Sequence, residues 1–137
     1  MKLELKHLLP YLPYNLNVLY FDNYGEKIFA KMTVEVPEGM FKSPKNEYPI
    51  SHILSSDYVE AFPILRPLSD LTKEIEANGK RFVPMEWLHK NYIGETMFKN
   101  PATWSHRSVT ILFSWHFDVF GLIKENLAID INLAAQI

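Results

Sequence analysis

The stretch LNVLYFDNYGEKIFAKMTVEV, residues 16–36, decides the fold of this chain. In both halves of the stretch, apolar side chains recur at every second position, which is the pattern of a β-strand with one buried face. The link between the halves, residues 22–25, is rich in residues that tolerate a positive φ and form tight turns. The stretch therefore predicts a β-hairpin whose strands are residues 16–21 and 26–36.

Segments on either side of the hairpin extend it into a small sheet. Residues 3–12 place leucines at helical spacing, but Pro10 limits the predicted helix to about two turns, which we expect to cover an edge of the sheet. Residues 37–49 contain three prolines and predict a long surface loop. Short strands are predicted at residues 48–54 and 58–65, which gives an antiparallel sheet of about three to five strands.

Helix patterns dominate the C-terminal half. Ser69 or Asp70 can cap a helix over residues 69–78, and the Asn-Gly pair at its end is typical of a helix C-terminus. Pro84 suits the first turn of another helix, which ends near Tyr92. The sequence therefore predicts two short helices in this region.

The longest apolar pattern runs from Val109 to Phe120. Its large apolar residues fall on one side of a helix, and a second apolar stripe lies beside the first, which predicts a helix that is covered on two sides and central to the fold. Together these patterns predict an α+β fold, in which a small antiparallel sheet from the N-terminal half packs against a C-terminal group of helices. The length of 137 residues suits a single domain over residues 1–137.

Composition limits the cellular setting of the protein. The chain has no cysteine, which excludes disulfides, thiolate metal sites and cysteine nucleophiles. Charges and prolines interrupt the first residues, so they lack the apolar core of a signal peptide. The apolar runs are far shorter than the roughly 20 residues that span a bilayer. We therefore expect a cytoplasmic protein without a membrane partner.

Charge gives no strong indication of a nucleic-acid partner. The 14 basic and 16 acidic residues are spread evenly along the chain, whereas nucleic-acid-binding proteins usually gather Lys and Arg on one face. Folding can still assemble such a patch, and the candidates are Lys80, Arg81, Lys90 and Arg107. A nucleic-acid accessory role therefore stays open as an alternative.

Signatures of catalysis and metal binding are missing from the sequence. No two of the five histidines lie two, three or four positions apart, and the five glycines are isolated from one another. We therefore assign no catalytic, cofactor-binding or metal-binding residue and expect no cofactor. A small hydrolase remains an alternative, which requires two carboxylates, or a carboxylate and a histidine, to converge in a pocket.

His116 and Asp118 are the functional candidates with titratable side chains. On the predicted helix they point about 200° apart, so they do not form an acid–base pair. We expect His116 to donate to a backbone carbonyl or to lie at the rim of the apolar face. Asp118, like Asp130, is expected to cap the local backbone around Gly121 and Asn126.

Aromatic residues make up 14% of the chain and allow two explanations. An exposed group of rings at Tyr11, Tyr14, Tyr92 or Trp104 would mark a site for a partner, since Tyr and Trp are enriched at interfaces. The alternative, which we favour, is a core built from large rings.

Three segments carry distinctive strings of mixed apolar and charged residues: LKHLLPYLPY at 5–14, PILRPLSDLTKEIEANG at 63–79 and WHFDVFGLIKENLAIDIN at 115–132. They resemble an uncharacterised family of small proteins that phages and prophages of gut Bacteroidetes often encode. The resemblance implies a phage-associated origin and transfers no activity to any residue. Where many relatives have glycine, this chain has Asn126, which also accepts the left-handed conformation and predicts a helix C-cap there.

The leading hypothesis from the sequence is a small accessory protein of a phage or prophage that acts as a non-enzymatic protein-interaction module. Its partner would be another protein or a second copy of the chain. The aromatic content and the missing signatures of catalysis favour this hypothesis.

Overall fold

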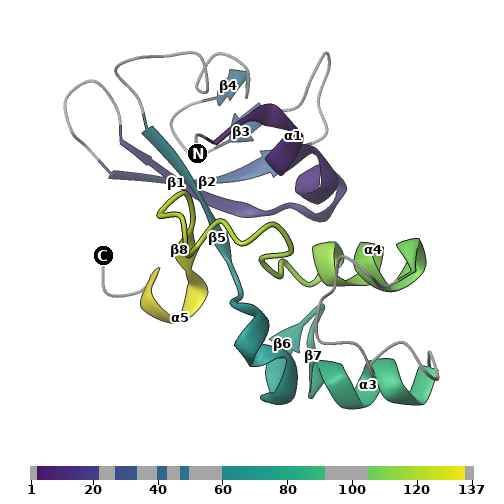
Figure 1. Ribbon diagram of the computed structural model, residues 1–137. Helices are drawn as coiled ribbons and strands as arrows, with labels where there is room; N and C mark the ends of the chain where they lie inside the picture. Colours follow the sequence, from purple (N-terminus) through teal and green to yellow (C-terminus); the bar gives the residue numbers. More distant parts are fainter. Residues whose placement is uncertain are drawn as a thin grey trace.

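A six-stranded β-sheet in the order β4-β3-β2-β1-β5-β8 forms the frame of the fold (Figure 1). The computed structural model describes residues 3–21, 27–33, 40–42, 47–49, 60–91 and 105–134. The strands of this sheet are β1 (Asn17–Phe21), β2 (Lys27–Thr33), β3 (Met40–Lys42), β4 (Glu47–Pro49), β5 (Glu60–Leu65) and β8 (Ile129–Asp130). The predicted α+β class is confirmed, since most of the described strands lie in the N-terminal half and most of the described helices in the C-terminal half.

The hairpin predicted from the alternating pattern is confirmed. β1 and β2 pair antiparallel, with Leu19 opposite Phe29. Apolar residues of one parity, such as Val18 and Met32, are fully buried, as expected of strands that pack one face on a core. The predicted turn at residues 22–25 and the end of the predicted second strand lie outside the described residues.

The loop predicted at residues 37–49 is wrong in part, because β3 and β4 extend the sheet there. β2 pairs with β3, and β3 pairs with β4, in antiparallel fashion. Pro49 lies in β4, which is the edge strand among the described residues, and a residue without an N–H is tolerated in an edge strand. The strand predicted at residues 48–54 overlaps β4, and the rest of it lies outside the described part of the chain.

β5 and β8 bring the middle and the C-terminal part of the chain together. β5 pairs antiparallel with β1, in agreement with the strand predicted at residues 58–65. β8 pairs parallel to β5, with Ile64 opposite Ile129. The sheet is therefore mixed, and the prediction of a wholly antiparallel sheet is wrong. The sequence did not reveal β8, because a strand of two residues is too short to show an alternating pattern.

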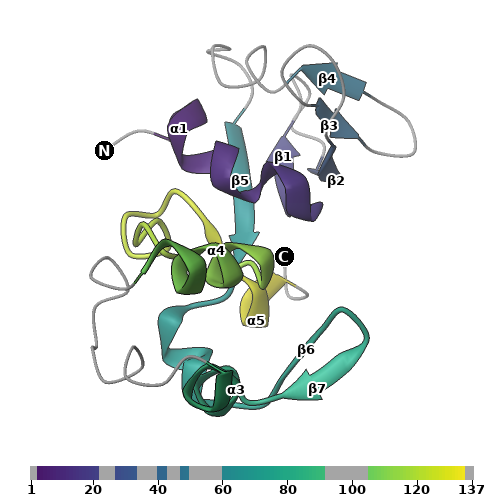
Figure 2. The ribbon, with the colours of Figure 1, turned by 90° about the vertical axis from the view of Figure 1, so that its right-hand side faces the viewer.

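The N-terminal segment covers one face of the sheet (Figure 2). α1 (Leu5–Leu8) continues into the 3₁₀ helix η1 (Leu9–Tyr14), because Pro10 cannot donate to an α-helical ladder. These helices lie over the face and not at the edge that we predicted, since their side chains share a buried cluster with β1 and β2. The members of this cluster are Leu3, Leu8, Tyr11, Leu16, Val18, Tyr20, Ala30, Met32, Leu65, Leu122 and Ala128.

A second group of elements lies below the sheet in Figure 1. It consists of η2 (Leu68–Thr72), β6 (Ile75–Ala77), β7 (Lys80–Phe82), α3 (Pro84–Asn91) and α4 (His106–Ser114). The elements enclose a second buried cluster, made of Leu71, Ile75, Leu88, Leu112, Trp115 and Phe117. α4 lies between the two clusters, because it contacts η1 and also contributes Leu112 to the second cluster. The helix predicted to begin at Pro84 is confirmed.

The helix predicted over residues 69–78 is wrong. A 3₁₀ turn fills its first part, and a two-stranded hairpin begins at Ile75, which pairs with Phe82. Asn78 and Gly79 have φ angles of 54° and 77°. Positive φ at both central positions is what a type I′ turn between antiparallel strands requires. The Asn-Gly pair therefore turns a hairpin and does not end a helix.

The helix predicted from Val109 to Phe120 ends earlier than expected. α4 starts after the N-cap Ser105, and its last residue is Ser114. The chain then turns at His116, whose φ is 65°. The carbonyl of His116 and the N–H of Asp118 then bond to the backbone of Arg66, which follows β5, and the helical ladder does not continue. The apolar pattern did not reveal where the helix ends. Most of the buried residues after Ser114 are apolar, whether the chain continues a helix or forms a turn, so the pattern is the same in both cases.

The C-terminal segment turns before α5 (Ile131–Ala134). Asn126 has a φ of 60°, so the predicted left-handed conformation is confirmed, but the residue ends a turn and not an α-helix. Asp130 Oδ1 accepts a hydrogen bond from the Asn132 N–H at 2.8 Å, so Asp130 does cap the local backbone, but at the start of α5 and not around Gly121 and Asn126 as predicted.

Candidate functional site

Four of the residues that the sequence singled out meet at one junction between η1 and the chain after α4: Tyr11, Tyr14, His116 and Asp118. Tyr11 is fully buried, and its hydroxyl donates to the carbonyl of Phe117. The Val119 N–H donates to the same hydroxyl oxygen at 3.4 Å. Burial raises the pKa of the Tyr11 hydroxyl above its ordinary value, so this group stays protonated.

His116 binds η1 through its imidazole ring. Its Nε2 atom lies 2.7 Å from the carbonyl oxygen of Tyr14. Because a carbonyl only accepts, Nε2 carries the proton and donates it, which confirms the predicted bond to a backbone carbonyl. Burial lowers the pKa of His116, and the positive charges of Arg66 and Lys31 lower it further, against the effect of the Tyr14 bond. The ring is therefore neutral at neutral pH.

Asp118 caps the turn that follows the junction. Its Oδ1 accepts from the Leu122 N–H at 2.7 Å, and its Oδ2 accepts from the Ile123 N–H at 2.9 Å. Its own N–H donates to the carbonyl of Arg66 at 2.8 Å. The predicted capping role is confirmed, and both carboxylate oxygens are engaged by backbone donors.

Arg66, which the sequence analysis did not single out, holds the junction from the side of β5. Its Nε donates to the carbonyl of Trp115 at 3.0 Å, and its Nη2 donates to the carbonyl of Glu76 at 2.8 Å. Its N–H donates to the carbonyl of His116 at 2.8 Å. Burial lowers the pKa of the guanidinium, while the charge of Asp70 opposes this effect. Arg66 thus connects β5, β6 and the end of α4.

The junction is a part of the architecture and not an exposed partner site. Tyr11 belongs to the core, which corrects its place among the exposed interaction candidates: the sequence shows that a ring is present but not which side of it is covered. Tyr14 is half-buried and contributes its carbonyl. The remaining interaction candidates, Tyr92 and Trp104, lie outside the described residues.

A different surface carries three aromatic side chains, of which Phe29 is exposed and Phe21 and Phe62 are half-buried. Residues directly opposite each other on antiparallel strands share a face, so Leu19 on β1 lies between Phe29 on β2 and Phe62 on β5. Phe29 is 50% exposed, although β2 is an interior strand. The rings of Phe21 and Phe62 make an edge-to-face contact, with centroids 6.3 Å apart. We define the outer sheet face as Leu19, Phe21, Lys27, Phe29, Lys31 and Phe62.

An open hollow of about 210 Å³ lies where the outer sheet face meets the C-terminal segment. It is lined by Leu19, Phe21, Phe62, Asn126, Ala128 and Ile129. None of these lining residues has a titratable side chain, and Asn126 alone among them has a polar one. The hollow can therefore accept an apolar group, but its side chains provide no general acid or base.

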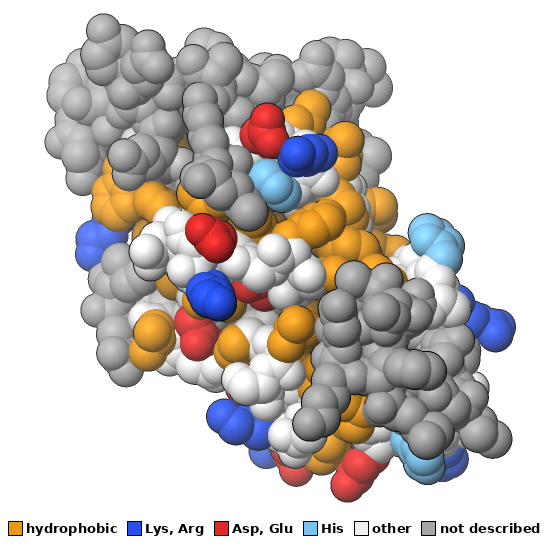
Figure 3. All heavy atoms as spheres, viewed as in Figure 1, with side chains coloured by type: hydrophobic (Ala, Val, Ile, Leu, Met, Phe, Trp, Pro, Cys, Tyr) orange, Lys and Arg blue, Asp and Glu red, His pale blue; other side chains and the backbone are white. Residues whose placement is uncertain are grey.

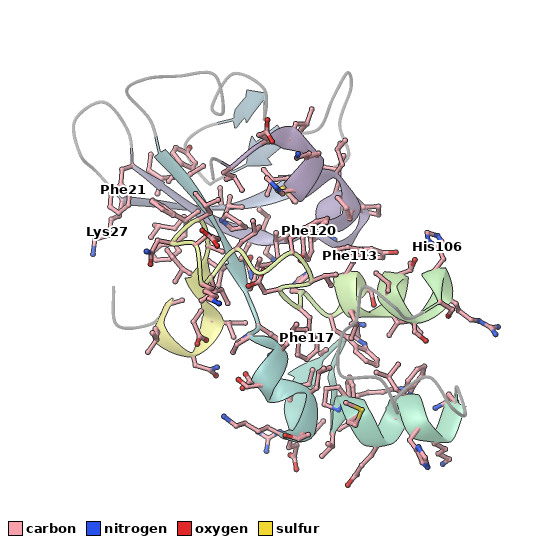
Figure 4. All side chains as sticks on the ribbon, viewed as in Figure 1. Phe21, Lys27, His106, Phe113, Phe117 and Phe120 are labelled. Carbon is pink, nitrogen blue, oxygen red and sulfur yellow. The ribbon has the colours of Figure 1, made fainter. Side chains whose placement is uncertain are left out.

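Two lysines lie on the same face as the aromatic rings. Lys27 is opposite Phe21, and Lys31 is opposite Asn17, in the pairing of β1 with β2. Both lysines are exposed. Figure 4 shows Phe21 and Lys27 together at one end of the sheet, and Figure 3 shows hydrophobic side chains beside a Lys or Arg at that edge of the surface. The outer sheet face therefore combines apolar area with two exposed lysines, and Glu60 of β5 occupies the register position opposite Phe21 on the same face.

The outer sheet face was not predicted from the sequence, although the alternating pattern contained a signal for it. The same pattern that placed Ala30 and Met32 on the buried side placed Phe29 on the opposite side. A phenylalanine at a solvent-facing position, with a lysine two residues away on each side, is an exception to polar-out patterning. Such an exception can be found before a structure is known.

The basic residues named from the sequence are spread over three elements: Lys80 and Arg81 on β7, Lys90 on α3 and Arg107 on α4. Figure 2 shows the turn between β6 and β7 pointing away from both helices. Arg81 is also paired, since its Nε lies 3.6 Å from Glu76 Oε2. These residues do not form the single basic face that phosphate binding favours.

Comparison with models of protein families, with curated proteins and with solved structures found no match to this chain. Among the described residues, no three His, Asp or Glu side chains gather in a way that could hold a metal ion. Within the same ranges, no helix has the length and apolar character needed to cross a bilayer. Function is therefore inferred from the geometry and chemistry of the described residues.

Proposed function

We propose that this protein is a non-enzymatic interaction module that binds a partner protein on its outer sheet face. The observation that carries the proposal is the exposure of Phe29, at 50%, on an interior strand. A single exposed apolar residue is ordinary, but Leu19, which lies directly opposite Phe29 and is fully buried, lines an apolar hollow together with the half-buried Phe21 and Phe62. An exposed ring next to a hollow of this kind is typical of interaction sites.

The magnitude of the apolar effect supports a role in binding. An aromatic side chain buries roughly 150–250 Å², so the exposed half of Phe29 corresponds to about 100 Å². Covering that area contributes about 2.5 kcal/mol at about 25 cal/mol per Å². A ring that contributes this much beside a hollow is typical of an interface anchor.

The described residues favour binding over hydrolysis. A hydrolase needs a carboxylate pair, or a carboxylate and a histidine, that face a substrate pocket. His116 and Asp118 instead bond to separate backbone groups within the junction. The lining of the hollow is apolar apart from one carboxamide. Binding of a partner protein requires no titratable group at this position.

We further propose that the module serves a phage or prophage and acts in the cytoplasm. The resemblance of three sequence segments to small phage-associated proteins supports the first part, and the absence of cysteine fits a reducing compartment. Phage genes flanking the coding gene would support this origin, and flanking genes of ordinary metabolism would count against it.

The interaction itself is tested by site-specific photo-cross-linking in cells of the source organism. A benzoyl-substituted phenylalanine replaces Phe29 in one variant and Glu86, which is exposed on α3, in a matched control. We expect irradiation to attach a defined protein to position 29 and not to position 86. No cross-linked protein at position 29, the same products from both positions, or a product that nuclease removes would contradict the proposed function.

A further inference from the structure

The outer sheet face arranges charge and apolar area in a fixed order. Along β2, Lys27, Phe29 and Lys31 are all exposed and lie two residues apart, so their side chains leave the same face of the strand. Four residue steps separate the two lysine Cα atoms by about 13 Å. Phe29 therefore lies between two positive charges, with the hollow next to it over β1 and β5.

The hollow has the size of a side chain and not that of a cofactor. Small-molecule sites usually measure roughly 300–1,000 Å³, whereas this hollow measures about 210 Å³ and is open to solvent. Five of its six lining residues are apolar. One bulky apolar side chain from a partner suits this space, as an anchor residue does in many interfaces.

On the basis of the proposed function, we propose that the partner presents an acidic segment with one bulky apolar side chain, which enters the hollow while neighbouring carboxylates face Lys27 and Lys31. Complementary charge speeds association and disfavours partners of the wrong sign.

A second copy of this chain suits the outer sheet face less well. A two-fold interface places the same patch on both protomers. Lys27 and Lys31 of one protomer would then face the same lysines of its partner, and like charges across an interface are unfavourable. The charge of the outer sheet face therefore favours a different, acidic partner.

A single-stranded nucleic acid matches the positive charge but not the hollow. Nucleic acids stack bases on exposed rings and track a positively charged groove with their phosphates. The described outer sheet face provides two lysines beside an apolar hollow, and the chain as a whole carries a net charge of −2. A protein segment is the better match, and nucleic acid becomes an outcome of the test.

The test uses the purified full chain and short fluorescent peptides. One peptide has a central Phe flanked by Asp and Glu, a second has the same Phe flanked by Lys and Arg, and a third replaces the Phe of the acidic peptide with Ser. Fluorescence anisotropy at low salt measures the dissociation constants. We expect the acidic Phe peptide to bind at least about tenfold more tightly than either of the other peptides.

Charge reversal provides the decisive comparison. In the double variant Lys27→Glu with Lys31→Glu, we expect the preference to reverse, so that the basic peptide binds more tightly than the acidic one. The matched control reverses the charge of two exposed lysines on β7 and α3, Lys80→Glu with Lys90→Glu, and should keep the native preference. Circular dichroism verifies that all the variants are folded.

Several outcomes would overturn the acidic-partner proposal. These are undetectable binding of the acidic peptide, equal binding of acidic and basic peptides, an unchanged preference after charge reversal, or tighter binding of oligothymidylate than of the acidic peptide. The cross-link at position 29 is independent of charge. A protein cross-link there without acidic preference would leave the proposed function in place and remove the acidic-partner proposal alone.

Discussion

At the scale of single residues, His116 combines a left-handed backbone, a largely buried ring and a bond to a carbonyl 102 positions earlier in the chain. A left-handed backbone costs a residue with a Cβ atom roughly 1–2 kcal/mol. The bonds to Tyr14 and to the Arg66 N–H offset this cost, because they connect η1, β5 and the end of α4 at one point. His116 therefore stabilises the fold through its neutral ring.

The neutral ring of His116 makes stability depend on pH. Burial and nearby cations lower the folded pKa of His116 below the ordinary 6.5, so in this range the unfolded chain binds a proton at a higher pH than the folded chain does. The neutral His116 ring makes its full contribution to the free energy of unfolding above the unfolded pKa of 6.5. This contribution is lost as the pH falls from there towards the lower pKa of the folded chain. We therefore expect the free energy of unfolding to fall on acidification.

The substitution His116→Asn isolates this effect, since Asn accepts the left-handed backbone and does not titrate. Urea unfolding between about pH 7.5 and pH 5 should show a weaker loss of stability in His116→Asn than in the native chain. The other titrating groups are common to both proteins. Parallel pH profiles for the two proteins would contradict the role given to His116.

At the scale of elements, Asn78 and Gly79 determine whether the chain forms a hairpin or a helix. The same pair is typical of a helix end and of a type I′ turn. Here both residues have positive φ, and Ile75 pairs with Phe82 across the turn. The hairpin contributes Ile75 to the second buried cluster, beside Leu88 of α3.

The substitution Asn78→Ala distinguishes a hairpin from a helix at this position. In the hairpin, Ala at a φ of 54° should lower the free energy of unfolding by about 1–2 kcal/mol, whereas Asn78→Gly should change it little. In a helix ending at residue 78, Ala would be neutral or stabilising, because it is the best helix former. Urea unfolding followed by tryptophan fluorescence measures the effect. An Asn78→Ala chain as stable as the native one would rule out the turn.

The elements predictable from the sequence are those that local pattern determines. The alternation of apolar residues in the stretch 16–36 was sufficient to predict β1 and β2, and Pro84 was sufficient to predict where α3 begins. β8 was not predictable, because its two residues pair with a strand about 65 positions earlier in the chain. The end of α4 was not predictable either, because backbone bonds to Arg66 replace the helical ladder there.

At the scale of the whole molecule, η1 and α4 hold two buried clusters together, and the proposed binding face lies on the other side of the sheet. Tyr11 belongs to the first cluster and donates to Phe117, which belongs to the second. α1 and η1 cover the face that carries Val18 and Met32. The outer sheet face lies on the opposite side, where residues 126–129 cover it in part and bound the hollow.

The candidate site is assembled from segments that are distant in the sequence. The alternating pattern alone is sufficient to place Phe29 on the solvent side of β2, although this was not predicted. That Phe62 and Ile129 would lie on the same face depends on strand order, which sequence patterns do not contain. In the junction, the bonds of His116 and Asp118 to backbone groups were predicted. Their meeting with Tyr11 and Tyr14 was not predicted, because those two tyrosines were expected at an exposed interaction site.

The most direct test of the proposed binding face is the amount of the cross-linked partner that a Phe29→Thr chain retains. Thr suits a strand and removes the exposed ring. We predict that retention falls at least about tenfold, while the free energy of unfolding falls by less than about 2 kcal/mol, in contrast to the roughly 3–5 kcal/mol of a core aromatic. A Glu86→Thr control should retain the partner fully. Full retention by a folded Phe29→Thr chain would contradict the account.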